Sequence, residues 1–152
     1  MRVILERSNL LKSLNHVHRV VERRNTIPIL SNVLLSASGA SLEMKATDLD
    51  LEVTEATAAN VEQAGATTVP AHLLYDIVRK LPEGAEVMLK LDESGNSMSV
   101  VSGRSSFRLQ CLPQADFPEL SAGSFSHIFR LESEALKGLI EKTQFAISTE
   151  ET

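Results

Sequence analysis

The sequence predicts an α+β fold in which the strands form antiparallel sheets and two helices pack against them. One observation is a repeated order of elements: a strand, a helix and three strands occur twice before residue 112. Another is the alternation of apolar and polar residues in the predicted strands, the period-two pattern of a half-buried sheet. Because most strands follow one another directly and helices are few, this order favours α+β over a doubly wound α/β fold.

The first half is predicted to contain a strand, a helix and three strands, at residues 2–6, 9–21, 32–37, 42–46 and 49–57. The helix is indicated by an apolar stripe at helical spacing, formed by Leu10, Leu14, Val17 and Val21. In the last two strands apolar residues alternate with polar ones, at Leu42, Met44, Ala46, Leu49, Leu51 and Val53. We therefore expect these six side chains to line one buried face of the sheet.

The second half repeats this order, with a strand, a helix and three strands predicted at residues 67–69, 70–81, 87–91, 97–101 and 106–111. Pro70 suits the first turn of the helix and Pro82 ends it. The expected core side of the helix consists of Leu73, Leu74, Ile77 and Leu81. Turns containing Gly95 and Gly103 separate the last three strands, so a meander of two hairpins is expected.

The opening of the chain begins to repeat near its end. Leu5, Leu10 and Leu14 return, at one constant offset, as Leu131, Leu136 and Ile140. This repeat predicts a first domain at residues 1–122, followed at 123–152 by a linker and the first strand and helix of an incomplete second domain. Modules of an array bury their ends against neighbours, so a chain ending inside a module is expected to leave apolar surface without a partner.

Composition limits the classes of function. A chain of 152 residues, 43% apolar and 23% charged, is typical of about one globular domain. No apolar run is long enough to cross a bilayer, and no secretory signal pattern opens the chain. Cys111 is the only cysteine, which excludes an internal disulfide and favours a reducing, cytoplasmic location. With no Trp and one Tyr, the chain has little with which to stack single-stranded bases.

The net charge of −5 hides a segregation of charge along the chain. Five Lys or Arg and one acid lie between residues 7 and 24, whereas six acids and one base lie between residues 41 and 62. Opposite the apolar stripes, the predicted helices carry basic stripes formed by Lys12, His16, Arg19 and Arg23, and by His72 and Arg79. The alternative for either helix is an ordinary solvated face, but the recurrence on both favours a row of phosphates.

Patterns with catalytic potential have simpler structural interpretations. Asp48 and Asp50 share a strand face, but a hard-cation site needs more oxygen ligands than the surrounding sequence supplies. Residues 102–105 lack the Lys-Ser/Thr pair of a phosphate loop and predict a hairpin turn. The four histidines lack zinc-ligand spacing, and Cys111 reads as a small core residue. The sequence therefore predicts no enzyme, no metal site and no cofactor.

Seven segments in order match one known family. They are TIPIL at 26–30, ATDL at 46–49, GATTVPA at 65–71, LPEGAE at 81–86, SGRS at 102–105, LPQADFP at 112–118 and LIEKTQF at 139–145. Through them the whole chain resembles the amino-terminal domain of the bacterial DNA polymerase III β subunit, the sliding clamp. The resemblance implies a DNA-clamp fold, with three such domains per chain and two chains closed head to tail around duplex DNA. It also implies that the helices line the hole and the sheets form the outside.

Position by position, the resemblance places the family's duplex-contacting arginine at Arg24, with Arg23 beside it. A second contact position, at the start of the second helix, falls on His72, and a position that meets single-stranded DNA falls near Glu150. His72 and Glu150 depart from the family pattern, because a neutral imidazole carries no charge and a carboxylate repels phosphate. Together with the basic stripes, this gives a predicted DNA-binding set of Arg24, Arg23, His72, Arg19, Lys12, Arg79 and Glu150.

The last strand of the first domain is implied to form the dimer interface. Arg104, Phe107 and Leu109 match positions that meet the third domain of the partner chain. An edge strand with alternating apolar residues invites such pairing. Ser106 stands where the family has a basic residue, so a smaller ionic contribution is expected.

The predicted function is that of a processivity factor, which tethers the replicative polymerase by encircling DNA and performs no chemistry. Weak, diffuse phosphate contacts suit a ring that must slide. The polymerase and the clamp loader are expected to bind domains outside this chain, and no membrane is involved. The competing hypothesis is an autonomous α+β protein-binding module that uses the edge near Phe107 and has no DNA role. A catalytic alternative would require a deep pocket lined by titratable groups.

Overall fold

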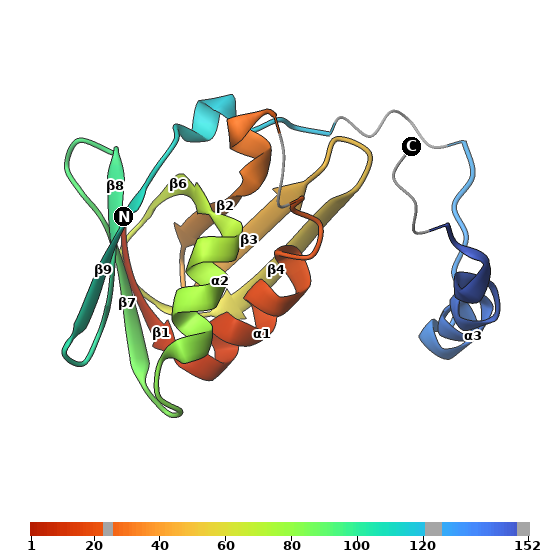
Figure 1. Cartoon of the computed structure of the whole chain (residues 1–152), viewed down its shortest axis with the longest axis horizontal. Helices are drawn as coiled ribbons and strands as arrows, with labels where there is room; N and C mark the ends of the chain where they lie inside the picture. The colour runs from red at the N-terminus through yellow and green to blue at the C-terminus, as the bar shows by residue number, and fades with distance from the viewer. Residues whose placement is uncertain (23–25, 121–125, 149–152) are drawn as a thin grey trace. The chain divides into compact units, whose positions relative to one another are not determined.

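Two antiparallel sheets form the framework of Met1–Leu120, the first of two compact units into which the chain divides (Figure 1). A computed structural model describes residues 1–22, 26–120 and 126–148. The sheets have the strand orders β5-β1-β7-β8-β9 (sheet A) and β4-β3-β2-β6 (sheet B). The strands are β1 Arg2–Glu6, β2 Asn32–Ser38, β3 Ser41–Thr47, β4 Glu52–Ala58, β5 Asn60–Gln63, β6 Gly65–Pro70, β7 Glu86–Leu91, β8 Ser97–Ser102 and β9 Ser105–Gln110. The predicted α+β class is confirmed.

The two halves of the unit exchange their first strands. β1 opens the first half but pairs with β7 of the second, from Arg2 opposite Lys90 to Glu6 opposite Glu86. In the same way β6 opens the second half but pairs with β2 of the first. An isolated bridge between Thr68 and Leu112 joins the end of the β9 segment to β6. Each sheet therefore contains strands from both halves, and the two halves share one core.

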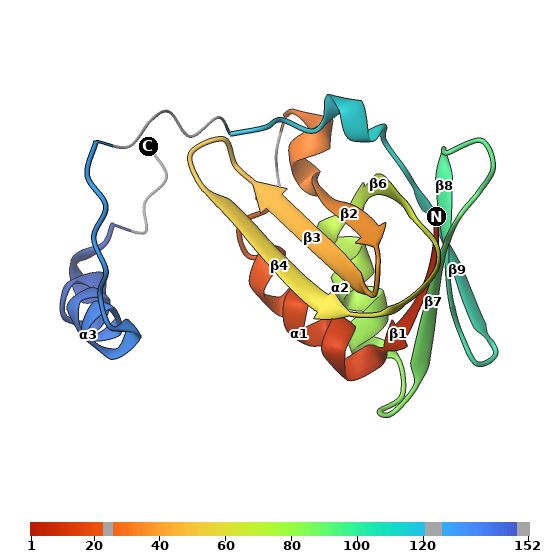
Figure 2. The same ribbon diagram turned by 180° about the vertical axis from the view of Figure 1, so that it is seen from behind.

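Helices α1, Arg7–Val17, and α2, Ala71–Lys80, lie side by side in front of sheet B in Figure 1 and behind it in Figure 2. The apolar stripe of α1 is fully buried at Leu10, Leu14 and Val17, as the sequence predicts. The core that the helices share with the two sheets also contains Val3, Leu35, Leu42, Met44, Leu74, Val78, Leu89, Met98 and Leu109. Short 3₁₀ helices occur at Pro28–Ser31, Gln114–Asp116 and Gln144–Ala146.

The predicted strand at residues 49–57 begins later than expected. The backbone turns at Asp48, whose Oδ1 accepts hydrogen bonds from the amides of Asp50 at 3.0 Å and Leu51 at 2.7 Å. Leu49 adopts a left-handed φ of 83°, and Leu49 and Leu51 are 45% and 54% exposed. The expected buried alternation at these two leucines is therefore wrong, because side-chain capping by Asp48 competes with strand pairing. β4 starts only at Glu52.

Helix α2 is rotated relative to the orientation expected from its sequence. Its buried residues are Ala71, Leu74, Ile77 and Val78, whereas Leu73 is 49% exposed. The expectation of a core position for Leu73 is therefore wrong. Leu73 and Leu74 are about 100° apart on a helix, so a stripe centred on Leu74 and Val78 leaves Leu73 toward solvent.

The second unit, Ser121–Thr152, contains helix α3 at Ser133–Thr143, in the region where the repeat predicts a helix. The strand expected before this helix does not form at residues 127–132, since a strand needs a neighbour to take its backbone hydrogen bonds. Every residue of α3 is at least partly exposed, including Leu136, Leu139 and Ile140. In the described ranges no helix has the length and apolar character needed to cross a membrane.

Candidate nucleic-acid interface

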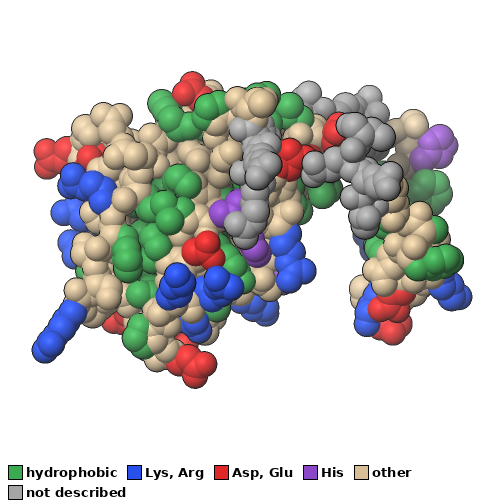
Figure 3. Space-filling model, in the orientation of Figure 1, with side chains coloured by type: hydrophobic (Ala, Val, Ile, Leu, Met, Phe, Trp, Pro, Cys, Tyr) green, Lys and Arg blue, Asp and Glu red, His purple; other side chains and the backbone are tan. Residues whose placement is uncertain are grey.

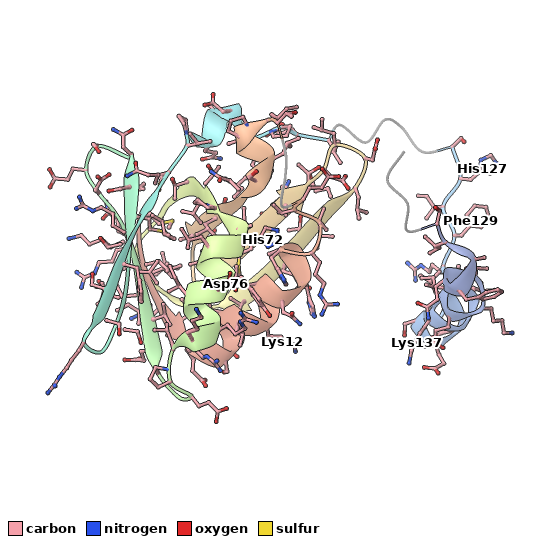
Figure 4. All side chains as sticks on the ribbon, in the orientation of Figure 1. Lys12, His72, Asp76, His127, Phe129 and Lys137 are labelled. Atoms are coloured by element: carbon pink, nitrogen blue, oxygen red, sulfur yellow. The ribbon has the colours of Figure 1, made fainter. Side chains whose placement is uncertain are left out.

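Four basic side chains are exposed on the helices α1 and α2 and the turns beside them: Lys12, Arg19, Arg79 and Lys80. Lys12 lies on the solvent side of α1 (Figure 4), and Arg19 lies in the turn that follows this helix. Arg79 and Lys80 occupy the last turn of α2. Figure 3 shows Lys and Arg side chains on the helical face turned toward the viewer. The amphipathic pattern of each helix explains the exposure of Lys12, Arg79 and Lys80, since the opposite side is in the core.

The four cations differ in how much of their charge is free. Arg79 forms an ion pair with Asp76 at 3.0 Å, and its guanidinium lies 5.5 Å from the centre of the Tyr75 ring. Lys12 and Arg19 have no ion-pair partner among the described residues. Lys80 is likewise in no ion pair there, so a polyanion would find unneutralised positive charge at Lys12, Arg19 and Lys80, and at Arg79 only in competition with Asp76.

Two histidines of the predicted stripes are engaged within the protein. His16 Nδ1 lies 2.7 Å from Oε1 of Glu55, which ties α1 to β4 of sheet B. His72 Nε2 lies 2.7 Å from the carbonyl oxygen of Val21, and since a carbonyl can only accept, Nε2 carries the proton. The other nitrogen, Nδ1, is buried and has no partner among the described residues. In this conformation neither ring nitrogen of His72 is available to a phosphate.

Reciprocal bonds hold the two helices antiparallel. Arg7, at the start of α1, donates from Nε to the carbonyl of Val78 at 3.1 Å and from Nη2 to that of Arg79 at 2.7 Å. A cation at these carbonyls satisfies the end of α2 and complements its dipole. At the other end His72 of α2 bonds the Val21 carbonyl. The backbones of the two helices that carry the basic residues are therefore held in a fixed relative position.

Aromatic stacking reinforces the junction between the helices. The rings of His18, which follows α1, and Tyr75 of α2 are stacked with their centres 3.9 Å apart and an interplanar angle of 7°. His18 Nδ1 also lies 2.7 Å from the Leu14 carbonyl. The turn that carries Arg19 is thus fixed to α2 by a stacked ring as well as by the His72 bond.

Some predicted site residues cannot be placed, and others were missed. Arg23, Arg24 and Glu150 lie outside the described residues. Sequence reasoning missed Lys80, which follows Arg79 at the helix end, and the helix-bridging role of Arg7. The sequence did contain a signal for Lys80. This residue directly follows Arg79, and the two cations lie in the last turn of α2, at its carbonyl end. Arg7 gave no local signal, since its partners are 71 and 72 residues away.

The predicted dimer-contact residues lie along β9, an edge strand of sheet A. Arg104 is exposed in the turn before this strand, and Phe107 is 39% exposed. Leu109 is only 1% exposed, because its side chain packs in the core beside its register partner Met98. Phe107 and the backbone of β9 can therefore meet a partner directly, whereas the Leu109 side chain can act only by supporting the strand.

The patterns with catalytic potential have structural roles. Asp48 caps its own turn, and Gly103, with a φ of 55°, closes the hairpin between β8 and β9. Cys111 is buried, and burial raises the pKa of its thiol, which keeps the sulfur protonated and poorly nucleophilic. Within the described ranges no group of three or more His, Cys, Asp or Glu side chains could hold a metal ion.

Comparison with known proteins places the chain in a family. Residues 1–121 match the family model described as "DNA polymerase III beta subunit, N-terminal domain". The chain belongs to the DNA polymerase III beta subunit family. Curated beta sliding clamps of this family are 51% identical over the whole chain in Caulobacter vibrioides and 43% identical over 149 residues in Escherichia coli K12. The chain spans about 41% of the length of the first of these relatives and 40% of the second.

Solved structures of sliding clamps share the fold. A crystal structure of the Bartonella birtlesii sliding clamp bound to griselimycin is 62% identical, with a TM-score of 0.92 over 99% of this chain and 40% of that chain. A Caulobacter crescentus pol III beta structure is 51% identical, with a TM-score of 0.92 over 100% of this chain and 41% of that chain. The clamp fold and the family predicted from the seven sequence segments are therefore confirmed.

Proposed function

We propose that this chain is the DNA-facing amino-terminal part of a processivity clamp, a non-catalytic subunit that encircles duplex DNA and tethers the replicative polymerase. The observation that carries the proposal is the rigid α1–α2 pair with exposed, unpaired cations at Lys12 and Arg19. Family membership supplies the context for this surface. The expected location of the protein is the cytoplasm.

The contacts with DNA are to the phosphate backbone and do not read bases. The proposed contacts are ammonium groups at Lys12 and Lys80 and guanidinium groups at Arg19 and Arg79, all on long, flexible side chains. Such groups bind phosphate whatever the base sequence. Arg23 and Arg24, which lie outside the described residues, remain proposed contacts on the basis of the sequence. We assign His72 the role of positioning the turn that carries Arg19, through its bond to Val21, and we leave Glu150 as a proposed site near single-stranded DNA. Low specificity suits a ring that slides.

The remaining architecture of the clamp is proposed from the sequence and from the length of the relatives. We propose a domain boundary at 122/123, with 123–152 as a linker and the start of a second domain. The exposed apolar residues of α3 support this division, since a helix with such a stripe normally packs against neighbours. The polymerase and the clamp loader bind domains outside this chain, and two full-length chains form a head-to-tail ring.

A second candidate function is an autonomous protein-binding module that acts through the β9 edge. The partly exposed Phe107 on this edge strand is the observation that favours it. The two functions are distinguishable because the module needs no duplex contact from α1 and α2. Binding of this chain to DNA decides between them.

Fluorescence anisotropy of the 152-residue chain with labelled duplexes of unrelated sequence tests the proposal. A few phosphate contacts without enclosure should give a Kd of roughly 10⁻⁴ to 10⁻⁶ M at physiological salt, because non-specific binding generally lies in this range. The same affinity is expected for every duplex, and it should rise steeply as salt is lowered. Nanomolar binding, or a preference for one duplex sequence, would contradict the sliding function.

Phe107→Ala is expected to weaken the ring of the full-length protein and convert dimer to monomer at low micromolar concentration. Aromatic side chains commonly anchor interfaces, and truncation of an anchor costs about 2 kcal/mol or more. Sedimentation velocity measures the change, with Leu73→Ala, an exposed apolar residue of α2 in the same unit, as the control. An intact dimer in Phe107→Ala at the same concentration would remove Phe107 from the interface.

A further inference from the structure

A second basic surface lies on sheet A, on the face turned away from the core. Arg2 of β1 is opposite Lys90 of β7, Lys90 is opposite Ser99 of β8, and Ser99 is opposite Arg108 of β9. These four residues therefore form one line across four adjacent strands. Figure 3 shows Lys and Arg side chains gathered on the left of the molecule, on the side of sheet A. We call Arg2, Lys90 and Arg108 the cation row.

The cation row keeps most of its charge. Lys90 and Arg108 are exposed and have no ion-pair partner in the part of the chain that the structure describes, whereas Arg2 is paired with Glu62 at 2.8 Å. The nearby Asp92 is held in its own turn, where it accepts hydrogen bonds from Ser97 Oγ at 2.9 Å and from Ser94 Oγ at 3.0 Å. A hollow of about 810 Å³ borders the row. Asp92 and Glu93 also line this hollow, so the free positive charge of the row is confined to Lys90 and Arg108.

An apolar row lies beside the cation row on the same face. Ile4 is opposite Met88, and Met88 is opposite Val101, two positions along the strands from the cation row. All three side chains are only partly buried. Their neighbours in sequence, such as Val3, Leu89 and Val100, are fully buried on the core side, so the apolar row is not needed to line the core. Met88 adds a flexible, polarisable contact that adapts to different partners.

The chemistry of this face fits an acidic peptide better than a nucleic acid. No aromatic side chain lies on it at the positions that face away from the core, so it lacks the stacking platform that single strands use. A strip of apolar side chains parallel to a strip of cations instead matches a segment in which acidic and apolar residues alternate. In an extended segment such residues point to opposite sides.

The length of the cation row agrees with that of a short extended peptide. Neighbouring strands lie about 4.8 Å apart, so the cation row spans about 14 Å from Arg2 to Arg108. Four residue steps of an extended peptide cover about 13 Å and present three carboxylates on one side. We propose that this face of sheet A docks an extended acidic–apolar segment of a partner protein, with carboxylates on the cation row and apolar side chains on Ile4, Met88 and Val101. The proposal does not depend on the DNA role of the helices.

The test uses a fluorescein-labelled peptide of alternating Glu and Leu, titrated with the 152-residue chain at low salt. The Lys90→Gln/Arg108→Gln variant should bind the peptide about tenfold more weakly, as expected for the loss of two exposed ion pairs. Its matched control, Lys12→Gln/Arg19→Gln, removes the same charge from the helices and should bind the peptide as the unmodified chain does. Duplex binding should show the opposite pattern. Far-ultraviolet circular dichroism checks that both variants fold.

Two further probes test the contribution of the apolar row and the alternative that the ligand is a single-stranded nucleic acid. A Glu–Ser peptide should bind more weakly than the Glu–Leu peptide if the apolar row contributes. Absence of Glu–Leu binding, or equal loss in both double variants, would overturn the proposal. Displacement of the peptide by a short oligothymidylate, with the same dependence on Lys90 and Arg108, would reassign the face to single-stranded nucleic acid and likewise overturn it.

Discussion

The Lys12→Gln/Arg19→Gln variant of this chain is expected to bind duplex DNA roughly 60-fold more weakly than the unmodified chain at about 0.1 M salt. Each phosphate neutralised by a cation adds about 0.9 to the slope of log affinity against log salt. Two contacts therefore add a slope of about 1.8, which corresponds to roughly 60-fold in affinity between about 1 M and 0.1 M salt. These two residues are chosen because both are exposed and neither has an ion-pair partner among the described residues. Anisotropy titrations across a salt series measure both the affinity and the slope.

The sheet-A variant Lys90→Gln/Arg108→Gln is the matched control for this experiment. It removes the same two charges from a different layer of the fold, so its duplex affinity and salt slope should stay close to those of the unmodified chain. An equal loss in both variants would mean that net charge, rather than the helical face, governs binding. A loss that depends on duplex sequence would indicate base readout, which a sliding protein does not use.

Leu74→Ala should destabilise the first unit by about 2–5 kcal/mol, since truncation of a fully buried leucine removes transfer free energy and leaves a cavity. That loss is a large part of the roughly 5–15 kcal/mol that stabilises a typical domain. The matched control is its neighbour Leu73→Ala, on the same helix and with the same chemical change. Because Leu73 is 49% exposed, its truncation should cost less than about 1 kcal/mol.

Urea denaturation followed by far-ultraviolet circular dichroism measures both free energies of unfolding. The sequence alone predicts similar costs, because it places both leucines on the core side of the helix. A difference of several kcal/mol supports the observed rotation of α2. Similar costs for the two variants would contradict it.

The sequence predicted the elements that depend on local patterns. The apolar stripe of α1 and the alternation of β3 gave their buried faces correctly, because helical and strand periods are local properties. The position of Lys12 followed directly, since residues opposite a buried stripe face solvent, whereas Arg19 lies in the turn after α1, which ends at Val17 and does not continue to residue 21 as expected. Gly103 marked its hairpin because its positive φ of 55° favours glycine.

Features that depend on distant partners were not predicted. The exchange of β1 and β6 between the two halves pairs residues far apart in sequence, such as Arg2 with Lys90 and Val33 with Val69. The bonds from Arg7 and His72 that hold the helices together join residues 71, 72 and 51 positions apart, so no local pattern indicated that His72 bonds the Val21 carbonyl. β5 was missed because its polar sequence carries no strand signal, and pairing with β1 alone creates it.

The central claim is that this chain belongs to a ring that encircles duplex DNA. It is tested most directly by whether the full-length protein stays bound to circular and to linear DNA. The full-length protein is loaded by its clamp loader onto a circular plasmid, washed at high salt, and then challenged with a restriction enzyme that cuts the plasmid once. Enclosure predicts that the protein stays on the circle through the wash and leaves when the DNA becomes linear. Loss from the circle during the wash, or retention on the linear DNA, would contradict enclosure.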